Sequence, residues 1–284
     1  MKQYLLTIQY DGTDFVGWQR QSLAHARNRS VQQTVEQGLE KLLRQEIHLR
    51  GAGRTDAGVH AFGQRAAFLA ESGIPTANIP RALNGTLPED VRITACQEVP
   101  LTFHPRYDAV GKVYEYYLLP GAVHSAFDRS RFFACGYELD TAFMAELAPL
   151  FEGRQNLRSF TANGTPVADY ERDIYHCRLT PFRAEVSLPW RRSGIFWRLS
   201  VCGSGFLYKT VRLLMGALLE AGKRKLDAAD IIRALAEPGA IIAPPAPARG
   251  LYLRQVFYAE ETLQKWLAEE KSCRKQEKPI DTAE

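Results

Sequence analysis

The sequence has few cysteines, no long apolar run and no leader-like start, and these absences argue against several classes of protein. The five cysteines are an odd number, lie far apart and include no Cys-x-x-Cys pair. This pattern argues against a disulfide framework and against a zinc ribbon. The longest apolar runs, such as 213–219, are far shorter than the roughly 18 residues of a membrane-spanning helix. No apolar signal segment follows Met1, so we expect a cytoplasmic protein that does not enter a membrane.

Motifs for bound metals and nucleotides are also missing. The six histidines are widely spaced, with no His-Glu-x-x-His pair and no His/Cys cluster, so we predict no metal site. The glycine-rich segment 51–58 fails the dinucleotide fingerprint because Asp56 stands where the third glycine is required. The Gly-Lys-Ser/Thr of a P-loop does not occur. A nucleophile elbow at Ser204 fails because Cys202 stands in place of its first glycine.

The composition is that of a globular protein with a small excess of positive charge. Hydrophobic residues make up 45% and charged residues 24% of the 284 residues, which argues against wholesale disorder. This length fits one large domain or two ordinary ones. Lys and Arg number 36 against 32 Asp and Glu, a formal net charge of +4. That excess permits a nucleic-acid partner if the cations gather on one face, but it does not require one.

The pattern of apolar residues predicts an α+β protein. Strands are predicted at 4–10, 47–50, 61–69, 91–99, 111–119, 174–179, 195–201 and 251–258, and helices at 31–44, 79–83, 141–151, 206–219 and 227–236. The order strand, helix, strand, strand occurs twice without βαβ alternation, which favours antiparallel or mixed sheets. We predict one domain over 1–105, a second over 106–262 and a polar tail over 263–284. The chain is expected to fray from Glu269 onward.

Asp56 lies in the segment with the strongest chemical signal, 50–61. Its three glycines allow unusual backbone conformations and close approach by another molecule. Arg54 stands two residues before Asp56, so the loop presents a cation beside a carboxylate. That arrangement suits an acidic catalyst acting on a polyanion. A tight turn in which the aspartate caps its own backbone explains the same spacing.

Arg212 is a charged residue on an otherwise apolar predicted helix, 206–219. A buried arginine without a partner is costly, so we expect it to face a carboxylate. Asp56 is one candidate, and Glu171 or Asp173 are structural alternatives. A side chain that extends from the helix end to solvent is a further alternative.

Two other segments carry aromatic residues of the kind that bind RNA. Alternation places Tyr114 and Tyr116 on one face of the strand 111–119. Aromatic side chains on a sheet stack on unpaired bases, although paired strand tyrosines are more commonly core or interface residues. The segment 103–107 mixes base-stacking and phosphate-binding residue types, and it fits an interdomain turn marked by Pro105 equally well.

Together these segments resemble the tRNA pseudouridine synthase A family. The most specific segment is Gly-Arg-Thr-Asp-Ala-Gly-Val-His-Ala at 53–61. The family's other segments follow in its order: 10–13, 17–19, 83–88, 103–106, 112–116, 205–212 and 250–253. The resemblance covers the chain up to about Tyr258.

The resemblance implies an enzyme that converts uridine to pseudouridine at positions 38, 39 and 40 of the tRNA anticodon stem-loop. It implies neither a cofactor nor a metal, and tRNA rather than DNA or a membrane as the partner. The implied fold is two ferredoxin-like, RNA-recognition-like α+β domains that flank a basic cleft. The implied assembly is a homodimer.

The resemblance also implies the site residues. Asp56 matches the catalytic aspartate and Arg212 the arginine paired with it. Tyr114 matches the tyrosine that stacks on the target base, and Arg54 the arginine that helps to displace that base. We expect Leu207 and Leu251 to complete the apolar walls around the free uracil. Scattered cations are expected to contact the RNA backbone, namely Arg20, Lys112, Lys209 and Arg254.

The sequence departs from the family in a few places. Pro105 follows His104 where alanine is commoner, and 153–157 stands where the family usually has His-Asp-Phe. The role of 153–157 therefore stays open. The basic loop Ser22–Arg29 is predicted to contact RNA.

Other functions fit parts of the sequence. The same chemistry on other RNAs is one, because related synthases share the Asp56 motif. A non-catalytic RNA-binding or tRNA-folding protein is another, although the presence of Asp56, Tyr114 and Arg212 argues against it. A small-molecule phosphate binder has no fitting motif.

Overall fold

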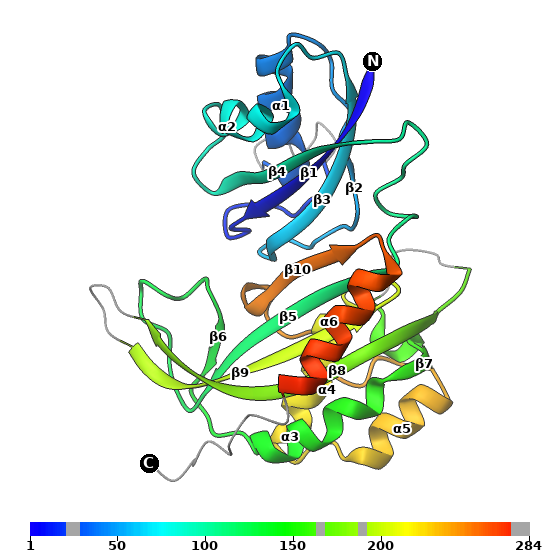
Figure 1. Cartoon of the computed structure of the whole chain (residues 1–284). Helices are drawn as coiled ribbons and strands as arrows, with labels where there is room; N and C mark the ends of the chain where they lie inside the picture. Colours follow the sequence, from blue (N-terminus) through cyan, green and yellow to red (C-terminus); the bar gives the residue numbers. More distant parts are fainter. Residues whose placement is uncertain (21–28, 163–167, 187–191, 274–284) are drawn as a thin grey trace. The chain divides into compact units, whose positions relative to one another are not determined.

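The computed structural model describes residues 1–20, 29–162, 168–186 and 192–273, and it contains two compact units (Figure 1). The first unit comprises Met1–Val110 and Tyr252–Tyr258, and the second comprises Gly111–Leu251 and the segment from Ala259 onward. Each unit combines helices with a mixed sheet, which confirms the predicted α+β class. The predicted RNA-contact loop Ser22–Arg29 lies, apart from Arg29, outside the described residues.

The first unit is built on a four-stranded sheet with a short additional strand. Its order is β4 (Val91–Val99), β1 (Lys2–Tyr10), β3 (His60–Ala70) and β10 (Leu251–Phe257), with β2 (Arg50–Gly51) paired to β3. Strand β1 is antiparallel to both β3 and β4, whereas β10 is parallel to β3, with Tyr252 opposite His60. The unit therefore uses a strand from the far end of the chain.

Two helices belong to the first unit. Helix α1 (Val31–Leu43) buries Val31, Val35 and Leu39, the spacing expected for one face of a helix. Helix α2 (Ile79–Asn84) follows a 3-10 turn, η2 (Thr76–Asn78), and contacts both α1 and β4.

Ser30 caps α1, because its Oγ accepts a hydrogen bond from the backbone N–H of Gln33 at 3.3 Å. Ser30 is fully buried, and replacing it with alanine leaves the N–H of the half-buried Gln33 without this partner. We expect Ser30→Ala to lower the free energy of unfolding by about 1 kcal/mol. Urea unfolding of the two proteins measures the difference, and Ser30→Thr should recover most of it.

The second unit is built on a five-stranded sheet. Its order is β6 (Phe133–Cys135), β5 (Gly111–Pro120), β9 (Arg192–Gly203), β8 (Glu171–Val186) and β7 (Gly153–Asn156). All pairs are antiparallel except β5 with β6. Strands β8 and β9 form the longest pair, and Cys177, Leu179, Leu199 and Val201 contribute to its buried side.

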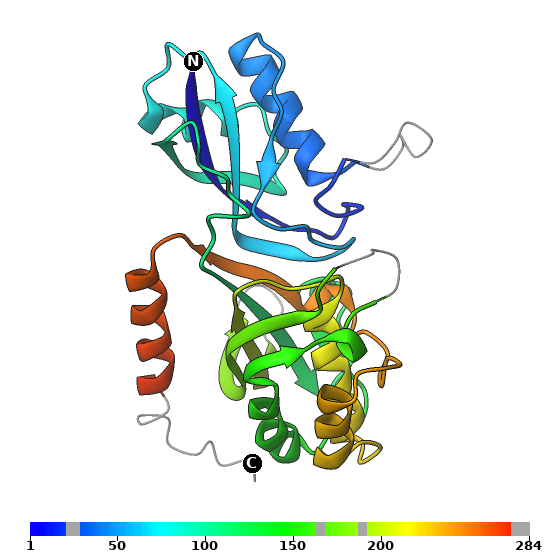
Figure 2. The same ribbon diagram turned by 90° about the vertical axis from the view of Figure 1, so that its right-hand side faces the viewer.

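Helices cover both faces of this sheet. They are α3 (Thr141–Leu147), α4 (Thr210–Gly222), α5 (Ala228–Ala236) and α6 (Glu260–Cys273), with 3-10 turns η3 (Ala148–Phe151), η4 (Arg158–Phe160) and η5 (Ala248–Gly250). Figure 2 shows α6 on the opposite side of the sheet from α4. Among the described residues, no helix is long and apolar enough to cross a membrane.

The predicted helix 141–151 is divided between α3 and the 3-10 turn η3, and three further predictions differ from the structure. Residues 47–49 are not a strand although Ile47 and Leu49 are buried, because Glu36 of α1 accepts the N–H of Leu49 at 2.9 Å in place of a neighbouring strand. Helix α4 begins at Thr210 and not at 206, because Lys209 has a left-handed backbone with φ 62°, which ends any helix that precedes it.

The third difference concerns the predicted polar tail over 263–284. Helix α6 continues through Glu269 to Cys273, and its Leu263 and Leu267 are buried. Two apolar residues four positions apart suffice to fix one helical face, although the segment is otherwise charged. The segment is so rich in charged residues that its composition predicts a polar tail in place of an amphipathic helix.

Candidate active site

Asp56 lies on the loop between β2 and β3, and a second segment of the chain holds that loop in place. Gly17 forms a β-bridge with Asp56, and the Trp18 N–H donates to the Thr55 carbonyl at 3.0 Å. The Gly58 N–H donates to the carbonyl of Phe15 at 3.3 Å. The segments 11–18 and 55–59 therefore act as one structural element.

Two glycines permit this close approach. A Cβ on Gly12 would lie 2.0 Å from the carbonyl oxygen of Val59. Gly17 has φ +110°, and a Cβ there would lie 2.5 Å from the carbonyl oxygen of Thr55. Side chains at these positions would push the two backbones apart, which explains why segment 11–18 carries glycine at both.

Buried polar side chains of neighbouring strands stabilise the loop through hydrogen bonds. The hydroxyls of Tyr10 and Thr55 share a hydrogen bond of 2.8 Å, and Gln64 Nε2 donates to the Gly53 carbonyl at 2.8 Å. Burial raises the pKa of the Tyr10 phenol, which keeps it neutral. His60 Nδ1 accepts the N–H of Gly12 at 3.0 Å. The sequence patterns assign no role to Tyr10, Gln64 or His60, since only tertiary contacts show what these side chains support.

The loop presents its two charged residues to the surface. Arg54 is exposed and Asp56 is half-buried. The turn after Asp56 is closed by its backbone carbonyl, which accepts the N–H of Val59 at 3.2 Å. The bond that closes this turn is therefore made by backbone atoms.

Tyr114 lies on β5 of the second unit, opposite Val201 of β9. Its ring is buried and meets the ring of Phe206 edge-on, with the centroids 5.2 Å apart. Tyr116 is fully buried, and its hydroxyl donates to the Pro247 carbonyl at 2.9 Å. Tyr116 is thus a core residue.

Arg212 lies in the first turn of α4 and is half-buried. Its Nε donates to the carbonyl of Ala246 at 2.8 Å, and the N–H of Ala246 returns a bond to the Arg212 carbonyl at 2.8 Å. These two bonds fix the orientation of the guanidinium. Glu171, one structural alternative as its partner, instead pairs with Arg154 at 2.7 Å.

The six predicted site residues come from both units. Arg54 and Asp56 share the loop of the first unit, whereas Tyr114, Arg212, Leu207 and Leu251 belong to the second. Leu207 is half-buried in the turn before α4, and Leu251 is buried at the start of β10.

The predicted scattered cations are not all on the surface. Arg20 and Arg254 are exposed and Lys209 is half-buried, but Lys112 is buried. Lys112 therefore lacks the exposure expected of an RNA contact.

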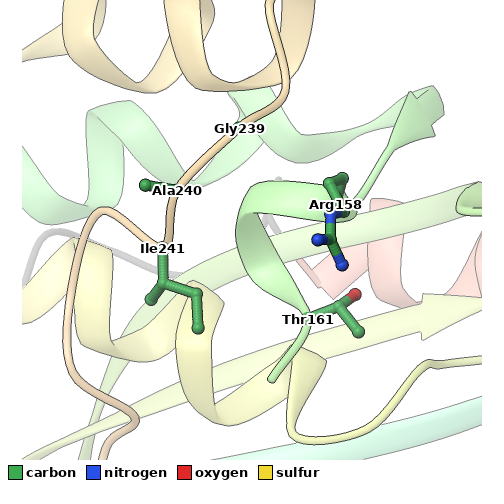
Figure 3. A pocket seen from close by; sticks show the side chains of 5 residues that line it. All are labelled: Arg158, Thr161, Gly239, Ala240 and Ile241. Atoms are coloured by element: carbon green, nitrogen blue, oxygen red, sulfur yellow. The ribbon is translucent and has the colours of Figure 1, made fainter. Parts of the chain in front are cut away.

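A separate hollow of about 470 Å³ occurs in the second unit (Figure 3). Arg158 and Thr161 line one side of it, and the segment Gly239–Ile241 lines the other. None of the predicted site residues belongs to this lining. Within the described ranges, no group of three or more His, Cys, Asp or Glu side chains could hold a metal ion.

The departure at 153–157 has local structural roles. Gln155 Nε2 donates to the carbonyl of Glu152 at 2.7 Å, and Asn156 Oδ1 accepts the N–H of Arg158 at 3.1 Å. Leu157 is fully buried. These contacts stabilise strand β7 and the turn that follows it.

Comparison with known proteins identifies the family to which the sequence of this chain is similar. Residues 6–108 and 147–259 match the tRNA pseudouridine synthase family. The chain belongs to this family. It is 38% identical over 264 residues to tRNA pseudouridine synthase A of Syntrophomonas wolfei, covering 92% of this chain and 100% of the relative. The corresponding enzyme of Moorella thermoacetica is 39% identical over 254 residues, covering 89% and 98%.

As a tRNA pseudouridine synthase, the protein is an isomerase. The matched ranges contain the Asp56 loop and also Leu207, Arg212 and Leu251, whereas Tyr114 lies between them. Another synthase A, from Ruminiclostridium cellulolyticum, is 37% identical over 265 residues, covering 91% of this chain and 100% of its own. The family resemblance inferred from the motifs is thereby confirmed.

Proposed function

We propose that this synthase isomerises uridine to pseudouridine at positions 38, 39 and 40 of the tRNA anticodon stem-loop, without a cofactor, and that Asp56 is its catalyst. The observation that carries the proposal is the Asp56 loop. A half-buried carboxylate sits there on a backbone braced by a second segment, in a chain that aligns over about nine-tenths of its length with synthase A relatives. Braced geometry suits a group that must meet a reacting atom precisely.

The reaction breaks the C1′–N1 bond of the nucleotide, turns the detached uracil, and forms a C1′–C5 bond, while C5 gives up its proton to solvent and N1 takes one up. Asp56 acts either by attacking the sugar as a nucleophile or by removing a proton from it as a base. In this proposal the guanidinium of Arg212 meets the carboxylate of Asp56 and orients it for either route.

The target base must leave its stack before this chemistry, at a cost of a few kcal/mol. Stacking on Tyr114 offsets roughly 1–3 kcal/mol of that cost. Arg54, exposed beside Asp56, helps to displace the base. Leu207 and Leu251 form the apolar walls that retain the free uracil.

The proposal includes the assembly and its setting. Two ferredoxin-like domains, 1–105 and 106–262, flank a basic cleft that receives the stem-loop. The protein acts as a homodimer in the cytoplasm. Recognition depends mainly on the shape and backbone of the folded RNA.

Mapping of pseudouridine in RNA from a strain that lacks the gene tests the assigned positions. We expect pseudouridine to disappear at tRNA positions 38–40 and to return when the wild-type gene is supplied. Losses at other RNA positions, with 38–40 intact, would instead support the same chemistry on another RNA.

Tyr114 offers a test of the stacking role. Tyr114→Ala removes the ring, and we expect kcat/KM to fall roughly 5- to 100-fold, since one stacked base is worth about 1–3 kcal/mol. Tyr114→Phe keeps the ring and should retain most of the activity. Steady-state tritium release from [5-³H]uridine-labelled tRNA measures both variants. Equal losses in the two would show that the ring face is not what matters.

A further inference from the structure

The loop 103–108 of the first unit carries an exposed aromatic ring beside a cation. Tyr107 is 74% exposed, the largest exposed fraction among the aromatic residues that the structure describes. The imidazole of His104 lies 4.3 Å from the Tyr107 ring, centroid to centroid, and the guanidinium carbon of Arg106 lies 5.7 Å from that ring's centroid. None of these residues has a role in the site proposed above.

The base of this loop is anchored to the sheet. The hydroxyl of Tyr258 donates to the Pro105 carbonyl at 2.8 Å, and the ring of Phe103 packs edge-on against Tyr258 at 4.9 Å. The side chain of Gln3, buried on β1, donates to the Phe103 carbonyl at 2.6 Å. The loop is therefore anchored by a residue of β1 and by the residue that follows β10.

The tip of the loop is also ordered by hydrogen bonds. His104 Nδ1 accepts the N–H groups of Arg106 at 3.1 Å and of Tyr107 at 3.3 Å. Asp108 Oδ2 accepts the N–H of His104 at 2.9 Å, and the Asp108 N–H donates to the His104 carbonyl at 3.0 Å. A ring presented on so constrained a backbone loses little conformational entropy when a partner covers it.

The chemistry of the tip matches a single-stranded nucleotide. A free aromatic face takes an unpaired base, and an adjacent arginine takes the phosphate. We propose that Tyr107 stacks on an unpaired base of the tRNA outside the target nucleotide, with Arg106 on a neighbouring phosphate and His104 holding the Tyr107 ring. This inference rests on the proposed function for its RNA substrate. It makes 104–107 a second RNA-contact site, separate from the Asp56 loop along the chain.

Equilibrium binding of an unmodified tRNA transcript at fixed salt tests the stacking. We expect Tyr107→Ala to raise Kd roughly 5- to 100-fold, and Tyr107→Phe to stay within about twofold of the wild type. In steady-state assays the loss should appear in KM more than in kcat. Arg106→Gln should reduce the slope of log K against log salt by about 1, the value for one phosphate contact.

Leu101 provides the matched control, because it is 65% exposed in the same unit but offers no ring. Leu101→Ala should bind the transcript like the wild type. If this surface instead binds a second copy of the chain or another protein, Tyr107→Ala and Leu101→Ala would change the sedimentation behaviour and leave Kd for the transcript unchanged. That result overturns the inference, and so does equal weakening by Tyr107→Phe.

The two proposals fail in different ways. If the wild-type protein binds the transcript but releases no tritium from it, the proposed function fails, while a higher Kd for Tyr107→Ala still supports the stacking site. If the wild type releases tritium and Tyr107→Ala binds normally, the stacking site alone is wrong.

Discussion

Asp56→Asn should reduce turnover by at least about 10³-fold while the protein still folds and binds tRNA. The substitution keeps the shape of the side chain but removes the negative charge and basicity that both proposed routes require. The turn at this position is closed by the Asp56 backbone carbonyl, and segment 11–18 braces the loop through backbone contacts, so these contacts remain when an amide replaces the carboxylate. Single-turnover tritium release and tRNA Kd, measured on the same preparation, separate chemistry from binding.

Glu89→Gln is the matched control for this experiment. Glu89 is an exposed carboxylate in the same unit, outside the segments that brace the Asp56 loop, and its substitution makes the same change in charge. We expect this variant to turn over at the wild-type rate. Activity in Asp56→Asn within tenfold of the wild type would show that Asp56 is not the catalyst.

Gly12→Ala should have the second large effect, although the residue makes no side-chain contact with any reactant. A Cβ at this position would lie 2.0 Å from the carbonyl oxygen of Val59, which is backbone and cannot rotate away. The segments 11–18 and 55–59 must then separate. We expect a loss of about 3 kcal/mol or more in the free energy of unfolding, the upper part of the range for overpacking.

The same substitution should lower activity beyond its effect on stability. At a temperature where the variant remains folded, kcat should fall roughly 100-fold, because a displacement of about 1 Å at a reacting group has that scale of effect. Gly73→Ala is the control, since no atom lies within 4 Å of a Cβ built there. If the two variants have the same free energy of unfolding, the contact between segments 11–18 and 55–59 is less close than these distances indicate.

Much of the fold follows from local sequence signals. Apolar residues at helical spacing predict α1, and runs of apolar, β-branched and aromatic residues predict β1, β3, β4 and β5 closely. The predicted secondary structure is wrong where contacts between distant segments outweigh the local sequence pattern. Residues 47–49 have the apolar pattern of a strand, yet side chains of α1 take their backbone hydrogen bonds. Helix α6 was missed because only Leu263 and Leu267 mark its buried face.

The site was less predictable than the fold. Motif spacing identified Asp56 and Arg54 as neighbours on one loop. It assigned no role to Gln64 or His60, whose support for the loop depends on contacts between segments far apart in the chain. The carbonyl of Ala246 as the partner of Arg212 Nε could not be predicted either, because backbone acceptors leave no residue-type signal.

The central claim is tested most directly with the purified protein and an unmodified anticodon stem-loop RNA that carries [5-³H]uridine at single positions. The reaction is run in buffer containing EDTA and no added cofactor, with Asp56→Asn assayed in parallel. The account predicts tritium release from positions 38, 39 and 40 by the wild type and none by the variant. Release that persists in Asp56→Asn, or that occurs only from other positions of the stem-loop, would contradict it.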